Sequence, residues 1–167
     1  MFDKQDVTSQ TNAVSLFRKH RHDILNQLQL IRAYIQIGRM PDAIRIVDAT
    51  AVWLQSLTVW QTRCKGVAER LVWIASNCPH VILRSIDEII VWNEDIVSEI
   101  EQALLSLEED ASDRGWTPLD LYIHNSNEKD ISIQIIVKVA SESQLPVVLG
   151  HGKSLCHVML TVNRIDT

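Results

Sequence analysis

Glycine, proline and cysteine are scarce in this chain of 167 residues, which contains 5, 4 and 3 of them. A chain with few glycines has few positions where backbone amides can wrap closely around a nucleotide phosphate, which counts against a nucleotide-binding loop. The three cysteines, Cys64, Cys78 and Cys156, are an odd number without metal-ligand spacing. We therefore expect reduced thiols, a cytoplasmic location and no metal site.

Long hydrophobic runs and an excess of basic charge are also missing. No uncharged apolar run approaches the roughly 18 residues of a membrane span, and the polar N-terminus does not resemble a secretory signal. The net charge of −5 argues against general nucleic-acid binding. What remains is a globular protein of one or two small domains, in which 46% of the residues are hydrophobic and 22% charged.

Charge is distributed unevenly along the chain. Residues 1–40 contain six basic and three acidic residues, a net of +3, whereas residues 85–130 contain thirteen acidic and two basic residues, a net of −11. The difference indicates two regions with different surfaces. The acidic block is also compatible with a merely solvated helix face.

Residues 8–37 contain neither glycine nor proline and predict one long helix. Thr8 or Ser9 is suited to cap its start, and Gly38 to end it. The apolar residues follow the three-four alternation of a heptad seam, interrupted by Arg21. They are Val14, Phe17, Ile24, Leu28, Ile31 and Ile35.

A second helix is predicted from Pro41, a residue favoured in a first turn, to about Thr62. Residues 1–64 thus form an antiparallel hairpin with wide apolar faces. Two such helices cannot bury both faces against each other, so we expect dimerisation into a four-helix bundle, with packing on the chain's own C-terminal part as the alternative. The apolar residues of the second helix include Ile44, Val47, Ala51, Leu54, Leu57 and Val59.

Residues 65–167 have a different pattern, which predicts a small α/β sandwich. β-Branched, partly alternating stretches indicate strands, and a strongly amphipathic stretch indicates a helix. The expected elements are helices at 67–78 and 94–111 and strands at 81–86, 119–124, 131–140 and 154–163.

One polar stripe of the first helix contains the residues that are best suited to a chemical reaction. Histidine is readily neutral at pH 7, so an exposed His22 can act as a nucleophile. Asp23 can take the ring proton, and Asn26, one turn further on, can orient the ring or a phosphoryl oxygen. His20 lies towards the apolar side. At about 100° per residue, the stripe holds Arg18, His22, Asn26, Gln29 and Ala33.

Basic residues surround this histidine. Arg18, Lys19 and Arg21 would attract an anionic group, so the segment is suited to accept a phosphoryl group, a reaction that depends mainly on positioning and charge neutralisation. Spacing alone does not separate this interpretation from an ordinary exposed histidine.

The same residues resemble a known motif. The phosphoacceptor hairpin of the sporulation initiation phosphotransferase family, related to citrate- and fumarate-type sensor histidine kinases, carries the pattern R-H-[DE]-x-x-N-x-L-x-x-I and then a helix break near glycine. The resemblance implies that His22 is phosphorylated and that a degenerate kinase-like ATPase domain follows. The matching residues are Arg21, His22, Asp23, Asn26, Leu28 and Ile31, followed by Gly38.

The chain departs from a kinase of this kind where ATP would bind. The stretch 99–104 lacks the kinase asparagine, the strand at 131–140 runs into 141–146 without the glycine box, and 150–154 holds the only closely spaced glycine pair. We therefore expect no cofactor in this chain.

The resemblance implies a homodimeric phosphotransferase of a phosphorelay. A single-domain response regulator would donate its aspartyl phosphoryl group to His22, which would pass it to the receiver domain of a transcription factor controlling sporulation. Mg²⁺ would be bound by the receivers. Arg18, Lys19, Arg21 and Gln29 would contact the partner, and no nucleic acid or membrane partner is expected. An ATP-dependent kinase fragment and a non-enzymatic scaffold for response regulators remain the alternatives.

Overall fold

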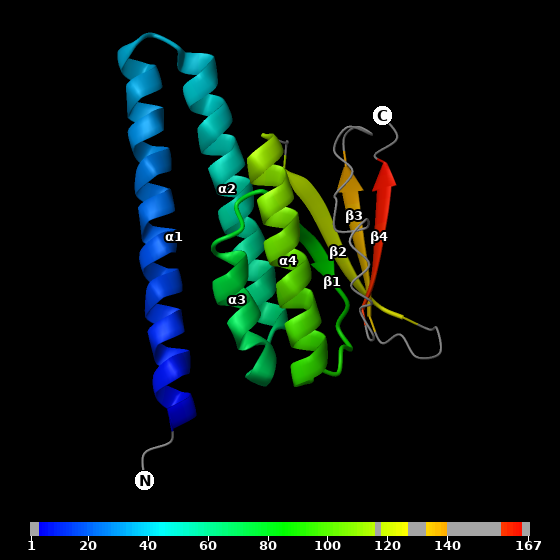
Figure 1. Ribbon diagram of the computed structural model, residues 1–167. Helices are drawn as coiled ribbons and strands as arrows, with labels where there is room; N and C mark the ends of the chain where they lie inside the picture. The colour runs from blue at the N-terminus through cyan, green and yellow to red at the C-terminus, as the bar shows by residue number, and fades with distance from the viewer. Residues whose placement is uncertain (1–3, 116–117, 127–132, 140–157, 165–167) are drawn as a thin grey trace.

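The computed structural model describes residues 4–115, 118–126, 133–139 and 158–164 of the chain. Within them, a long helical hairpin stands beside two further α-helices and a four-stranded sheet (Figure 1). The predicted combination of helices and a small sheet is confirmed. None of the helices in these ranges is long and apolar enough to span a membrane.

The hairpin consists of α1, Lys4–Gln36, and α2, Met40–Arg63, which run in opposite directions (Figure 1). The predicted capping role of Thr8 and Ser9 is wrong, because α1 begins earlier and both residues lie inside it. The residues before them include no glycine or proline that would stop the helix from extending towards the N-terminus.

Gly38 ends α1 as predicted. Its backbone φ of 74° lies in the left-handed region, which glycine adopts at the lowest cost. The amide of Arg39 donates to the carbonyl of Tyr34 at 2.9 Å, and the amide of Gly38 donates to the carbonyl of Ile35 at 3.1 Å. These are the two hydrogen bonds of a Schellman motif, so the turn is closed by the backbone itself.

The helix predicted at 67–78 is divided and ends earlier. A short 3₁₀ helix η1, Gly66–Ala68, leads into α3, Glu69–Ala75, and a turn follows. Proline disfavours helical backbone at the residue before it, so Pro79 prevents the helix from continuing through Cys78.

The sheet has the strand order β1-β2-β3-β4. β1, Val81–Ile86, runs parallel to β2, Leu119–Asn125, which is antiparallel to β3, Ile133–Val139, and β3 is parallel to β4, Val158–Arg164. α4, Glu94–Arg114, supplies the crossover that a parallel pair such as β1 and β2 requires.

The predicted elements of this part agree with the structure to within a few residues. The strand at 81–86 is confirmed, and α4 runs three residues beyond the predicted helix end at 111. Of the strands predicted at 131–140 and 154–163, the portions at 131, 132, 140 and 154–157 lie outside the described residues.

A single core joins the C-terminal half of α2 to the sheet. α2 lies along β1, and its side chains Leu57 and Trp60 are buried in the same cluster as those of α3, α4 and the strands. Part of the hairpin therefore packs on its own chain, which was the alternative to dimerisation. The α4 and strand side chains of this core include Ile100, Leu104, Leu107, Leu121, Ile123, Ile135 and Val137.

Two cysteines belong to this core. Cys64 and Cys78 are free thiols and almost fully buried. Burial raises the pKa of Cys64 to about 12, with Lys65 opposing the shift slightly, and burial also raises the pKa of Cys78. Both thiols are therefore protonated and unreactive near neutral pH.

Neighbouring leucines of α4 offer a matched test of this packing. Leu104 is 1% exposed and Leu105 is 46% exposed. We expect Leu104→Ala to lower the free energy of unfolding by about 2–5 kcal/mol, since it leaves a cavity in the core. Leu105→Ala should change it by less than about 0.5 kcal/mol. Urea denaturation measures both, and equal losses would contradict the assignment of the buried face.

Candidate functional site

His22 lies on the solvent-facing side of α1, about midway along the helix. Its side chain is 72% exposed. Half-buried residues of α1, among them Ile24 and Ile31, face α2 and α3 instead. The polar stripe predicted for the first helix therefore does point to solvent, and a partner protein can reach the imidazole.

Both short contacts of the His22 ring are made at Nδ1. The Asn26 amide nitrogen lies 3.1 Å from Nδ1, and a carboxylate oxygen of Asp23 lies 3.6 Å from it. Within the described residues, no hydrogen bond reaches Nε2. The structure thus brings together the three residues for which the sequence predicted chemistry, on a side chain that is largely exposed.

The predicted partner-binding residues are exposed and separate from the ring. Arg18, Lys19, Arg21 and Gln29 are all solvent-accessible on α1. Within the part of the chain that the structure describes, none of them makes a hydrogen bond or an ion pair with the His22 ring. They add polar and mostly basic surface on the same helix as the imidazole.

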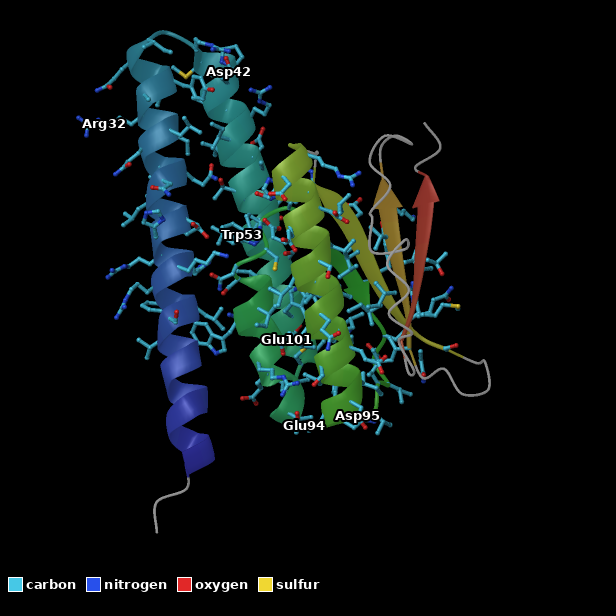
Figure 2. The ribbon with its side chains drawn as sticks, viewed as in Figure 1. Arg32, Asp42, Trp53, Glu94, Asp95 and Glu101 are labelled. Carbon is cyan, nitrogen blue, oxygen red and sulfur yellow. The ribbon has the colours of Figure 1, made fainter. Side chains whose placement is uncertain are left out.

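His20 anchors α1 to the rest of the chain. Its Nδ1 lies 2.6 Å from the backbone carbonyl of Ser76, so the ring N–H donates a hydrogen bond to the turn after α3. Its ring also packs edge-on against Trp53 of α2 (labelled in Figure 2), with the centroids 5.2 Å apart. Residues two apart on a helix differ by about 200°, so anchoring His20 inwards directs His22 outwards.

A cleft of about 480 Å³ lies beside His22. One wall belongs to α1, the opposite wall to the second half of α4, and the turn before β1 lies between them. Sequence reasoning missed the contribution of α4, although the acidic block at 85–130 was a signal of it. The lining includes Lys19, Asp23, Asn26, Asn77, His80, Glu108, Glu109 and Asp113.

His80 and Glu108 tie two sides of this cleft together. The Glu108 carboxylate accepts hydrogen bonds from the His80 amide at 2.9 Å and from the His80 ring Nδ1 at 2.7 Å. The side-chain hydrogen bond raises the pKa of His80, burial opposes this effect, and the negative charge of Glu108 adds to it. The wall formed by α4 is therefore held at a fixed distance from the start of β1.

No metal site is evident here. Within the described residues, no group of three His, Cys, Asp or Glu side chains gathers in a way that can hold a metal ion.

A comparison of the sequence with protein-family models relates this hairpin, with its exposed histidine beside a carboxylate and an amide, to a class of signalling proteins. The family model described as Sensor kinase SpoOB-type, alpha-helical domain, matches residues 3–51. The match covers α1 from its start, the turn at Gly38 and the first half of α2, and it includes His22. No curated protein matches the chain. The helical part is thus similar to the alpha-helical domain of a sensor-kinase family, which relates the chain to two-component signalling.

The His80–Glu108 pair predicts a pH dependence of stability. Because the folded-state pKa of His80 is raised above its ordinary value of 6.5, the pair's stabilising contribution is fully present below about pH 6.5 and is lost as the pH rises through the raised value. We expect the difference in unfolding free energy between wild type and His80→Gln to shrink between pH 6 and pH 9. A difference that grows with pH would contradict this account.

Proposed function

We propose that the protein is a phosphorelay phosphotransferase in which His22 carries the phosphoryl group between the aspartates of two response-regulator receiver domains. The observation that supports this most strongly is the geometry of the His22 ring: its Nδ1 faces Asn26 and Asp23, whereas the described residues make no hydrogen bond to Nε2 of this largely exposed side chain. The similarity of residues 3–51 to the alpha-helical domain of SpoOB-type sensor kinases supports the same class of chemistry.

The covalent step uses this ring and its two neighbours. Nε2 attacks the phosphorus of an aspartyl phosphate, the N–P bond forms, and the P–O bond breaks so that its electron pair leaves with the aspartate carboxylate. The ring becomes positively charged, with its remaining proton on Nδ1. The carboxylate of Asp23 stabilises that charge, and the amide of Asn26 can turn so that its oxygen accepts the Nδ1 proton in a hydrogen bond. The reverse reaction delivers the group to the second receiver.

Charged residues around His22 and the docking geometry of the receiver assist the transfer. Arg18, Lys19 and Arg21 create a positive surround for an incoming acidic receiver pocket, which favours encounter. Mg²⁺ would be held by that pocket. Each receiver must present its aspartate in line with the same Nε2, so both dock on the same face.

The uncovered apolar surface of the hairpin supports a homodimer. α1 and α2 expose apolar side chains along one side each, although both helices also bury other side chains within the chain. So many exposed apolar side chains on one hairpin are unusual for a monomer, and pairing of two hairpins would cover them as a four-helix bundle. The exposed residues are Phe17, Leu28 and Ile35 of α1 and Ile44, Val47 and Leu54 of α2.

The middle of α4 favours phosphotransfer over ATP-dependent kinase activity. Where a related kinase carries its asparagine, this chain has residues 99–104, whose members Ile100, Ala103 and Leu104 are core side chains. Glu101 of the same stretch pairs with Arg70 at 3.3 Å (Figure 2 labels Glu101). This helix therefore carries packing and ion-pair residues in place of nucleotide ligands, and labelled ATP should not phosphorylate the protein.

His22→Gln tests the phosphotransfer directly. We expect wild type to take labelled phosphoryl groups from a phosphorylated single-domain receiver without ATP, and the variant to take none, because glutamine has no nucleophilic nitrogen. His124→Gln, a change of the same kind on β2, should leave the transfer intact. Transfer retained in His22→Gln would refute the assignment, and autophosphorylation from ATP would favour the kinase alternative.

Substitutions of two leucines of α1 test the proposed dimer. Leu28 is 56% exposed and is one of these apolar side chains, whereas Leu30 is 44% exposed on the opposite side of the helix. Burying an unpaired carboxylate costs several kcal/mol, so Leu28→Glu should raise the dissociation constant of the dimer at least about 100-fold. Leu30→Glu should have little effect. Sedimentation equilibrium reads both, and a monomeric wild type would exclude the bundle.

A further inference from the structure

The cleft beside His22 is built from both halves of the chain. Asp23 and Asn26, the two residues whose side chains approach His22 Nδ1, also line the cleft on the α1 side. Glu109 and Asp113 of α4 line the other side. A protein that brings an aspartate to His22 must therefore cover the mouth of the cleft and meet α4 as well as the hairpin.

The electrostatics of the cleft select a cationic group. Carboxylates of Asp23, Glu109 and Asp113 line it, and Lys19 is the one fully charged base in the lining, whereas Glu108 is already bonded to His80. Glu109 and Asp113 form no ion pair with the residues that the structure describes. The lining is thus acidic next to a hairpin surface that is basic.

A buried acceptor in the same lining also lacks a donor. Asn77 is 4% exposed, and its amide nitrogen donates to the carbonyls of Leu16 and Trp73 and to the Ser76 hydroxyl. Its amide oxygen has no hydrogen-bond partner in the structure. A buried oxygen without a donor is costly, so a cationic donor bound in the cleft would be favoured if a small shift of the Asn77 side chain brought this oxygen to it.

We infer that the cleft receives a basic side chain of the docked receiver domain, so that the second half of α4 takes part in recognition. This rests on the proposed function and adds to it a contact made by the C-terminal part of the chain. The docking surface then has two signs of charge: Arg18 and Arg21 meet the acidic pocket of the receiver, while the cleft meets a basic residue beside that pocket. Opposite charges on the two sides of His22 orient the receiver as well as attract it.

The walls of the cleft are braced before any partner arrives. His20 holds α1 to the turn after α3 through Ser76, and Glu108 holds α4 to the start of β1 through His80. Little ordering is then required when the receiver docks, which favours a specific contact.

The test removes two charges from the cleft without changing side-chain shape. The variant is Glu109→Gln with Asp113→Asn. Its matched control is Glu94→Gln with Asp95→Asn, which makes the same two chemical changes in the first turn of α4 (Figure 2). At about 1.5 Å per residue, the control lies roughly 20 Å from the cleft.

A single-domain receiver is first phosphorylated by a labelled acyl phosphate, and transfer of the label from this receiver to the full chain is then measured. The receiver chosen is the one that phosphorylates wild type fastest. We expect the cleft variant to raise KM about 3- to 10-fold with kcat changed less than about twofold, and to weaken the salt dependence of KM, because charged surface contacts act mainly on encounter. The control variant should match wild type.

Equal KM values for wild type and the cleft variant, or equal increases in the cleft and control variants, would overturn this inference while leaving the proposed function standing. Failure of wild type to accept label from every receiver tried would instead overturn the proposed function, and the inference with it.

Discussion

The rotation of α1 about its own axis is set by His20, which donates to the Ser76 carbonyl at 2.6 Å and packs edge-on against Trp53. With this ring turned inwards, the helix presents three different surfaces at once. His22 faces solvent, the apolar side with Leu28 stays uncovered, and Asp23 faces the cleft against α4. A rotation of α1 by one residue position, about 100°, would change the direction in which His22 points and would turn Asp23 away from the cleft.

The C-terminal part of the chain has a mechanical role in this arrangement. Its core takes in the end of α2 through Leu57 and Trp60, so the hairpin is not a free arm. The turn between α3 and β1 accepts the hydrogen bond from His20 and carries His80, which in turn fixes Glu108 of α4. The described residues of the C-terminal part thus hold α1 in place through core packing and through the hydrogen bonds of two histidines.

Local patterns predicted the helices and several of the neighbours in the site. The contact of His22 with Asn26 follows from a spacing of four residues on a helix, so the sequence was sufficient to identify it. The approach of the Asp23 carboxylate to the same nitrogen was expected only from its adjacency in the chain. The end of the first helix at Gly38 and the strand at 81–86 were also predicted from local sequence, from a glycine and from a run of β-branched residues. The division between residues 1–64 and 65–167 stays a prediction, as do the roles of the site residues.

Local patterns left two features unpredicted: the position where α1 begins and the acidic wall of the cleft. Thr8 and Ser9 are good capping residues, but nothing before them stopped α1, which begins at Lys4. The acidic wall of the cleft lies more than eighty residues along the chain from His22, and only the crossover helix α4 brings it there. The uneven charge of the sequence indicated two kinds of surface, but it did not reveal that they meet beside one histidine.

The central claim is that Nε2 of His22 is the atom that carries the phosphoryl group. Nitrogen and phosphorus NMR of the ¹⁵N-histidine-labelled protein, after incubation with a phosphorylated receiver and no ATP, reads this directly. We expect one modified histidine, His22, with phosphorus bonded to Nε2 and a proton retained on Nδ1. Phosphorus bonded to Nδ1, to another histidine or to none would contradict the account.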